Sequence, residues 1–296
     1  MYNKYGASAG YLLGHANNPM NYERMVLSQV LELSPLDLEE LFRDPTHTKR
    51  RVHFLISAHP SLIDPTKPES KVASQYIVDK ICMEVLENQV DEVRKICEML
   101  QDGGQMDATG RMFFKYRVHQ FLREGRAVKI FPILSKTKGN KLEGNCYVYD
   151  DYTATDTGVP MSCLGLPKLE EKVIYAEETG TAEVGIYYRA AEGNFPSVDS
   201  WLHLRLDPQV PPTLLRFQMS LTETTYAVEK AGLDRVDGLI SAEKKLLVVI
   251  TEKGIQPKIL VPVDCLAGKL DACSPDTVFP VFHLPLSKEE LFANHP

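Results

Sequence analysis

The chain has 296 residues, of which 44% are hydrophobic and 25% charged, with 18 Gly and 19 Pro. This length predicts about two domains or one large one, and the composition excludes a collagen-like chain, a coiled-coil rod and a mainly disordered protein. No stretch approaches the ~20 consecutive apolar residues of a membrane span, and the N-terminus lacks the basic start and apolar run of a secretory leader. We therefore expect a globular protein that does not insert into a membrane.

The six cysteines are scattered, without a C-x-x-C pair and without a histidine at ligand spacing. This pattern argues against a structural zinc site and against a disulfide framework. We expect reduced thiols and, with them, an intracellular protein.

The charge of the chain is unevenly distributed. The formal net charge is −7, yet the window from Arg111 to Lys141 holds nine Lys and Arg and a single acid, Glu124, which gives it a net charge of +8. Such a window is typical of a surface that binds a polyanion. It is also consistent with a solvated helix face followed by a basic hairpin.

Residues 1–68 contain six prolines with short helical patterns between them, which predicts an N-terminal helical segment. Ser34 followed by Pro35 predicts a helix start, with the helix continuing to about Phe42. His53–Ala58 fits either a short strand or a buried helical turn. From Ser70 to about Leu100 no Gly or Pro occurs, and the apolar residues predict one long helix. Its apolar stripe needs a cover, either the protein's own core or a protein partner.

The rest of the chain, 69–296, is predicted to form a mixed sheet flanked by helices. A second helix spans about Ala108 to Glu124 and ends at Gly125. Strands are expected at Val128–Leu134, Cys146–Tyr149, Lys172–Ala176, Val184–Arg189, Val198–Leu206, Thr213–Ser220 and Leu246–Thr251, with a helix at Tyr226–Ile240 before the last of them. A β-β-β-α-β order after a helix predicts the α/β (α+β) class, and the apolar final strand is expected to be fully buried.

Two polar residues stand out in the predicted hairpin of this sheet. Asp199 lies at the start of one strand and Gln218 near the end of the next. Since the start of one antiparallel strand lies beside the end of its neighbour, these side chains should meet. A carboxylate and an amide oxygen are ligands that Mg²⁺ accepts, and Mg²⁺ beside a phosphodiester can activate water. Alternatively, Asp199 caps a turn and Gln218 makes a structural hydrogen bond.

These residues also carry a family resemblance. Asn194-Phe195-Pro196-x-Val198-Asp199-Ser200, followed by Leu215-x-Phe217-Gln218-Met219-Ser220 and by Gly232-Leu233, resembles the PD-(D/E)XK restriction-endonuclease-like domain of fungal Crinkler and retrotransposon-hot-spot type proteins. The resemblance covers roughly residues 70 to 292 and includes the upstream helix Phe113–Leu122. It implies a restriction-endonuclease-like domain over 69–296. Residues 1–68 would then be a remnant of an ATPase module or a separate helical cap, although no G-x-x-x-x-G-K-[ST] motif occurs.

Carried over, the resemblance makes Asp199 the metal-binding aspartate and puts Gln218 at the acidic-or-Gln position, with Mg²⁺ or Mn²⁺ as the metal. The chain departs from the pattern twice, because Ser220 stands where the family has Lys and Lys115 stands where the upstream helix would offer Glu. The candidate catalytic residues are therefore Asp199, Gln218, Lys115 and Ser220. Other side chains able to supply charge are Lys230 and Glu223.

Together, these patterns predict a nucleic-acid-binding protein with a degenerate nuclease-like fold, with DNA favoured over RNA. The expected nucleic-acid contacts are Arg111, Lys115, Arg117, Arg123, Arg126 and Lys129. Weak metal-dependent endonuclease activity stays open, and the alternative is a catalytically inactive effector or a protein-interaction module derived from a mobile element. A nuclear location is suggested by the resemblance and by the triplet Lys49-Arg50-Arg51, with the cytoplasm as the other location.

Overall fold

The fold falls into two compact units. The first comprises Met1–Val118 with Phe292–Pro296, and the second comprises His119–Leu291. The computed structural model describes residues 19–43, 55–60, 68–72, 74–86, 89–102, 105–106, 108–133, 146–152, 162–174, 182–190, 196–205, 209, 211–220, 225–242, 244–265 and 280–293. Over this part of the chain it contains seven helices and a large mixed sheet, which confirms the predicted mixed α/β class. The boundary predicted after residue 68 stays a prediction.

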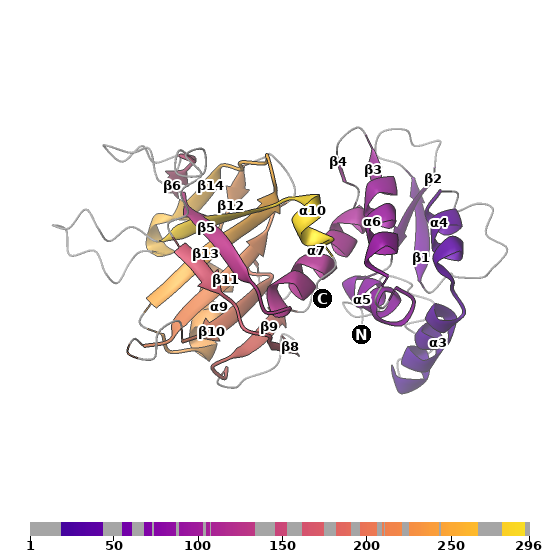
Figure 1. The fold of residues 1–296 in the computed structure, drawn as a ribbon, viewed down its shortest axis with the longest axis horizontal. Helices are drawn as coiled ribbons and strands as arrows, with labels where there is room; N and C mark the ends of the chain where they lie inside the picture. The colour runs from indigo at the N-terminus through magenta and orange to yellow at the C-terminus, as the bar shows by residue number, and fades with distance from the viewer. Residues whose placement is uncertain are drawn as a thin grey trace. The chain divides into compact units, whose positions relative to one another are not determined.

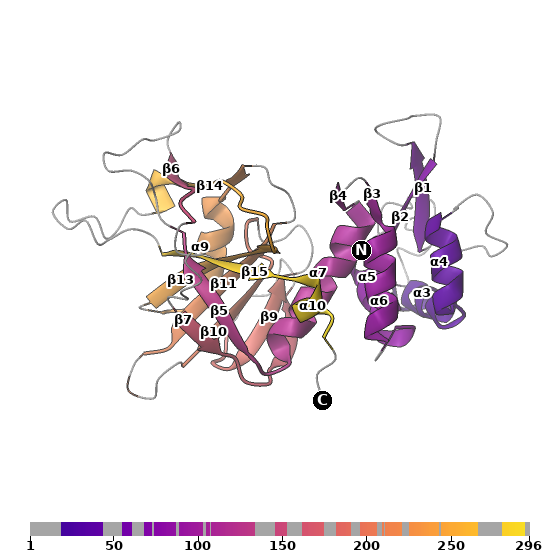
Figure 2. The ribbon, with the colours of Figure 1, turned by 45° about the horizontal axis from the view of Figure 1, so that its top comes forward.

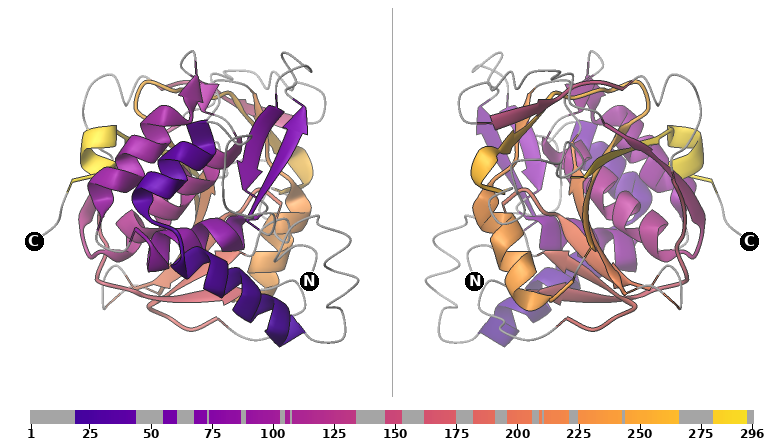
Figure 3. Two further views of the ribbon diagram at one scale, coloured as in Figure 1. Left: turned by 90° about the vertical axis from the view of Figure 1, so that its right-hand side faces the viewer. Right: turned by 90° about the vertical axis from the view of Figure 1, so that its left-hand side faces the viewer.

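The described part of the first unit is mainly helical, with two short hairpins (Figure 3, left). Its elements are α3 (Pro19–Leu31), α4 (Pro35–Arg43), β1 (Ile56–Pro60), β2 (Pro68–Val72), α5 (Gln75–Glu84), α6 (Val90–Met99), β3 (Gln101–Asp102), β4 (Gln105–Met106) and the start of α7 (Ala108–Arg123). Helix α4 starts where the sequence predicts, because Ser34 and Asp37 cap it reciprocally. The Ser34 N–H donates to the Asp37 carboxylate at 2.8 Å, and the Asp37 N–H donates to the Ser34 hydroxyl at 3.2 Å.

The single long helix expected from Ser70 to Leu100 is wrong. Helices α5 and α6 replace its helical part, and the chain turns between them at Val85 and Leu86, whose N–H groups both donate to the Ile81 carbonyl. Leu86, like most of the apolar stripe beyond it, is buried within the unit. The two short helices bury most of the stripe, with Met83 exposed, and a turn made without Gly or Pro does not alter the spacing of the apolar residues. The continuous helix suggested as a surface for a protein partner is therefore not present.

The second unit is built on an eight-stranded sheet in the order β7-β5-β15-β13-β11-β10-β9-β8 (Figures 1 and 2). The strands are β5 (Ala127–Pro132), β7 (Ser162–Gly165), β8 (Glu170–Ile174), β9 (Ile186–Ala190), β10 (Ser200–Leu204), β11 (Thr213–Met219), β13 (Lys244–Glu252) and β15 (Val281–Leu286). β13 lies between β11 and β15 and pairs with both in parallel, and its residues Leu246–Thr251 are all buried. The prediction of a fully buried last strand is confirmed for this core of β13.

The sheet has to curl, because its two edge strands are close in sequence. β7 ends at Gly165 and β8 begins at Glu170, and the extended chain between them spans at most about 17 Å. Eight flat strands would separate the edges by about 34 Å. The backbone after α7 is hydrogen-bonded to the link that joins these edge strands. The Leu169 N–H donates to the Arg123 carbonyl at 3.0 Å, and the Leu166 N–H donates to the Arg126 carbonyl at 2.9 Å.

Gly125 makes this close approach feasible. Its φ is +77°, and a Cβ at this position would lie 2.9 Å from the Lys168 backbone nitrogen. Any larger residue would meet both a left-handed backbone conformation and a steric clash. The glycine that the sequence marks as a helix end therefore also allows the chain to lie against the link between β7 and β8.

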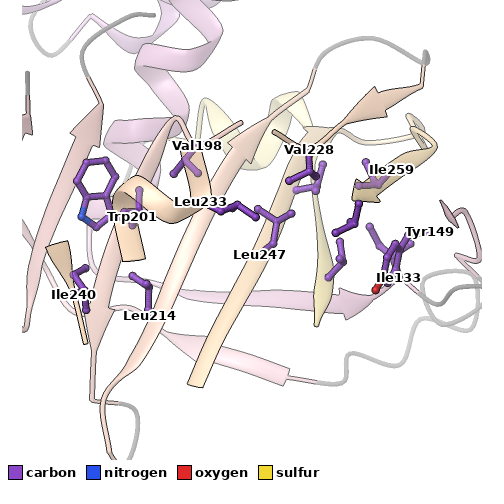
Figure 4. Close-up of a cluster of buried hydrophobic side chains, with 14 of the residues drawn as sticks. Ile133, Tyr149, Val198, Trp201, Leu214, Val228, Leu233, Ile240, Leu247 and Ile259 are labelled. Atoms are coloured by element: carbon purple, nitrogen blue, oxygen red, sulfur yellow. The ribbon is translucent and has the colours of Figure 1, made fainter. Parts of the chain in front are cut away.

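The predicted order of a helix, three strands, a helix and a strand is present as α7, β9–β10–β11, α9 (Lys230–Leu239) and β13. The helix expected from Tyr226 begins only at Lys230, because Tyr226–Ala227 form the short strand β12, which pairs with Ile259–Leu260. β9, β10 and β11 form an antiparallel meander, and β11 pairs with β13 in parallel, with α9 as the crossover. Leu233 of α9 belongs to an apolar cluster with Trp201, Leu214 and Leu247 on one face of the sheet (Figure 4). The right view of Figure 3 shows α9 beside the sheet.

A smaller three-stranded sheet completes that apolar layer. Its order is β12 (Tyr226–Ala227), β14 (Ile259–Pro262) and β6 (Cys146–Tyr149). Val228, Ile259 and Tyr149 of this layer belong to the same buried cluster as Leu233 (Figure 4). The remaining short elements are η1 (Val263–Cys265) and α10 (Lys288–Leu291). No helix in the described ranges has the length and apolar character needed to cross a bilayer.

Candidate functional site

Asp199 and Gln218 lie beside each other at one end of the β10–β11 hairpin. Ser200 pairs with Phe217. Asp199, just before Ser200, therefore lies across from Gln218, just after Phe217. The Met219 N–H donates to the Asp199 carboxylate at 2.7 Å, and the Gln218 side-chain amide donates to the Met219 carbonyl at 3.3 Å. Asp199 is half-buried, whereas Gln218 is buried. The predicted juxtaposition therefore exists, and both side chains engage the same stretch of backbone.

The loop before Asp199 is held against the start of α9. Ser197 has a φ of 63°, and its hydroxyl accepts the Glu229 N–H at 2.7 Å. Pro196 packs so closely on the helix that a Cβ on Gly232 would lie 1.5 Å from its carbonyl oxygen. Gly232 is thus required for close packing. These contacts fix the backbone that carries Asp199 relative to α9.

Ser220 and Lys115 stand at the two positions where the chain departs from the family pattern, and Lys230 and Glu223 are the other side chains predicted to supply charge. Ser220 is buried, and its N–H donates to the Ile250 carbonyl at 2.8 Å. Lys230 begins α9 and is ion-paired with Asp234 one turn later. Lys115 belongs to the first unit, so its predicted meeting with Asp199 stays a prediction. Glu223 lies outside the described residues.

On the opposite face of the hairpin, three buried side chains form a hydrogen-bonded chain. The Tyr187 hydroxyl donates to the Ser200 hydroxyl at 2.7 Å and lies 2.7 Å from Nδ1 of His119. Since Tyr187 gives its proton to Ser200, it accepts one from His119. Burial raises the pKa of Tyr187 well above its usual value, so it remains a neutral donor. His119 is therefore a packed histidine of the core.

The basic window is only partly available on the surface. Arg111 and Lys129 are exposed and Lys115 is half-buried, whereas Arg117 is 3% exposed. Arg123 donates to Glu171 at 2.7 Å. Arg126 pairs with Glu124, and its guanidinium carbon lies 4.1 Å from the centre of the Phe121 ring. The other lysines of the window, Lys136, Lys138 and Lys141, lie outside the described residues.

A second charged group on the α9 face of the sheet was not anticipated from the sequence. Arg216 of β11 is 1% exposed, and it donates to Oδ1 of Asp237 at 3.1 Å. Lys245 donates to Oδ2 of the same carboxylate at 2.8 Å. Burial lowers the pKa of Arg216 below its usual value, and the Asp237 carboxylate opposes that shift. A signal was present, because an arginine in the apolar run Leu214–Phe217 of a central strand must find a partner.

The chemistry that the Asp199 end of the β10–β11 hairpin can perform depends on the metal-ligand atoms that it offers. It offers one carboxylate, with one oxygen engaged by a backbone amide, and one neutral amide oxygen next to it. Asp199 and Gln218 are the residues that would hold a Mg²⁺ or Mn²⁺ ion. Together they carry less negative charge than the ligands of such ions usually do. Within the described ranges, no three His, Cys, Asp or Glu side chains come together as a metal-binding group.

Comparison with known proteins adds no family to this geometry. No family model, curated protein or solved structure matches the chain.

Proposed function

We propose that the chain is a nucleic-acid-binding protein whose second unit has a degenerate PD-(D/E)XK-type, restriction-endonuclease-like core. The observation that carries this proposal is the position of Asp199 beside Gln218, at the end of the hairpin within the order α7, β9–β10–β11, α9, β13. The resemblance requires its metal-binding aspartate and its acidic-or-Gln residue at these two places. The proposal includes an intracellular site of action and a preference for DNA over RNA.

The side chains at the Asp199 end of the β10–β11 hairpin favour binding of nucleic acid over its cleavage. Ser220 cannot provide the positive charge that a lysine would offer a phosphate or a nucleophilic water. Gln218 adds no negative charge beside Asp199, so a divalent ion would be weakly held. Binding of a polyanion needs only exposed basic side chains on the protein, and Arg111 and Lys129 are exposed.

Equilibrium binding to a fluorescently labelled duplex DNA tests the proposal. At about 50 mM salt the intact chain should bind, and Arg111→Glu or Lys129→Glu should each weaken binding by about fivefold or more. Lys253→Glu is the matched control, because this exposed lysine lies outside the basic window, and it should change affinity less than about twofold. A duplex RNA of the same sequence should bind more weakly.

Two results would overturn the proposal. Absence of DNA binding at low salt would remove the nucleic-acid hypothesis and leave a protein-interaction module, and an equal loss from the Lys253 control would show that DNA is not bound through the basic window. Cleavage of the labelled strand in Mn²⁺ that Asp199→Ala abolishes would show that the core is an active nuclease.

A further inference from the structure

The chain that flanks the smaller sheet, at Tyr152 after β6 and at 255–257 before β14, meets the large sheet at His283. This histidine lies in β15, between β5 and β13, and is 2% exposed. Its Nε2 is 2.7 Å from the Thr251 hydroxyl, which donates its own proton to the Ile255 carbonyl at 3.0 Å. The ring of Tyr152 meets the His283 ring edge to face at 5.1 Å, and the Tyr152 hydroxyl donates to the Pro257 carbonyl.

The hydrogen bonds fix the tautomer of His283. A hydroxyl has one proton, and Thr251 gives its proton to Ile255, so it must accept a proton from Nε2 of His283. The proton of the neutral ring is therefore on Nε2, and Nδ1 holds the lone pair. In the described part of the chain, Nδ1 is buried and has no hydrogen-bond partner. A second proton can enter only at Nδ1, where it would create a buried charge without an acceptor.

We propose that His283, with Thr251 and Tyr152, forms an acid-sensitive latch that holds the β6–β14–β12 sheet and the turn after β13 on the large sheet. When His283 is neutral, its interactions join β15 and β13 to the segment after β6. When His283 gains a proton, the buried arrangement becomes less stable than one in which the ring reaches water. The layer then opens locally, because the interactions that break are those of Tyr152 and of the turn after β13. This inference does not depend on the proposed function.

Neighbouring charges do not offset this response. The segment after β6 runs Asp150, Asp151, Tyr152, and burial raises the pKa of Tyr152, so that this tyrosine stays neutral. β5 places Phe131 opposite His283. In β13, Glu252 follows Thr251, and its carboxylate lies 3.6 Å from Lys288. Burial alone lowers the pKa of His283, from its ordinary 6.5 to about 4.

The sign of the pH effect follows from this lowered pKa. Above pH 6.5, His283 is neutral in both the closed and the open layer, and the latch is at full strength. As the pH falls from 6.5 to about 4, the open form gains a proton and the closed form does not, so the stability of the latch is lost progressively. At pH 5 the equilibrium constant for opening should rise about 30-fold over its value at pH 7.5.

Hydrogen exchange of single amides in the whole chain, corrected for the intrinsic pH dependence, measures this opening. The reporters are the amides of Tyr226 and Val228, which donate to the Lys258 and Leu260 carbonyls at 2.7 and 2.8 Å. Their opening constants should rise about 30-fold from pH 7.5 to pH 5, whereas that of Ser220, bonded to the large sheet, should change much less. In His283→Gln, which keeps a donor for Thr251 but does not titrate, the rise should fall below about threefold.

The matched control is His203→Gln, which removes another buried histidine whose pKa burial lowers, in β10. It should leave the response of the reporters intact. An unchanged response in His283→Gln, or an equal rise at Ser220, would overturn the latch. If that variant does not fold, the ring protons of His283 in the unaltered chain decide by NMR titration. A midpoint near 4 is expected, and one near 6.5 would overturn the proposal.

Discussion

Two polar groups lie along β11 on the α9 side of the sheet, and they differ in charge and in burial. In the middle of the strand, Arg216 is fully buried and shares the Asp237 carboxylate with Lys245. At the carboxyl end, Gln218 carries no charge, and the neighbouring Asp199 is half-buried and accepts a backbone N–H. The first group holds two cations around one shared carboxylate, and the second has one carboxylate near solvent.

The difference separates structural charge from charge that can serve a ligand. A guanidinium removed from water is tolerated only with a carboxylate beside it, so Arg216 and Asp237 depend on each other for stability. A carboxylate that keeps access to water and accepts a backbone N–H does not depend on a buried opposite charge in this way. Substitutions at the Arg216 group should therefore damage folding, whereas those at Asp199 should leave the fold nearly intact.

The largest effect is expected at Asp237. Asp237→Ala leaves the buried guanidinium of Arg216 without this carboxylate and should lower the free energy of unfolding by about 3 kcal/mol. Urea unfolding measures the loss. Asp234→Ala is the control in the same helix, because its pair with Lys230 is exposed, and it should cost no more than about 0.5 kcal/mol. Equal losses would contradict the contrast, and Arg216→Met in the Asp237→Ala chain should restore most of the stability.

The next effect concerns the loop that carries Asp199. Gly232→Ala forces a methyl group against the Pro196 carbonyl and should cost about 2 kcal/mol or more. Gly238→Ala, in the same helix, meets nothing within 4 Å and should stabilise the protein by up to about 1 kcal/mol. Thermal unfolding of the two variants side by side gives the comparison. A stable Gly232→Ala chain would show that the loop does not need its close contact with α9.

The smallest effect is expected at Asp199 itself. Asp199→Asn keeps an oxygen that can accept the Met219 N–H and should change the free energy of unfolding by less than about 0.5 kcal/mol. Asp199→Ala loses that hydrogen bond and should cost about 1 kcal/mol. Urea unfolding measures both. A loss of several kcal/mol in the Asn variant would mean that this carboxylate is as structural as that of Asp237.

The local elements were largely predictable because their signals are local. The Ser34 cap, the helix end at Gly125 and the apolar strand at Leu246–Thr251 each follow from neighbouring residues. The meander, crossover helix and parallel strand follow from the order of such elements, and that order places Asp199 beside Gln218. This much of the candidate site could therefore be predicted from periodicity and strand pairing.

Long-range pairing could not be predicted in the same way. β15 inserts between β13 and β5, although it is the last strand in the chain, and nothing in Val281–Leu286 indicates its neighbours. The partner of Arg216 is 21 residues away on a helix, so finding it requires the rotation of α9 about its axis as well as its position on the sheet. The burial of Arg117 could not be predicted for the same reason, since a count of charges does not show which face of a helix is covered.

The central claim, that the chain binds nucleic acid through exposed basic residues, is tested most directly by the salt dependence of DNA binding. A plot of log affinity against log salt concentration should fall with a slope of about −0.9 for each phosphate contacted. Lys129→Glu should make the slope shallower by about one unit, while Lys253→Glu should leave it unchanged. A slope near zero, or the same slope in all three chains, would contradict the account.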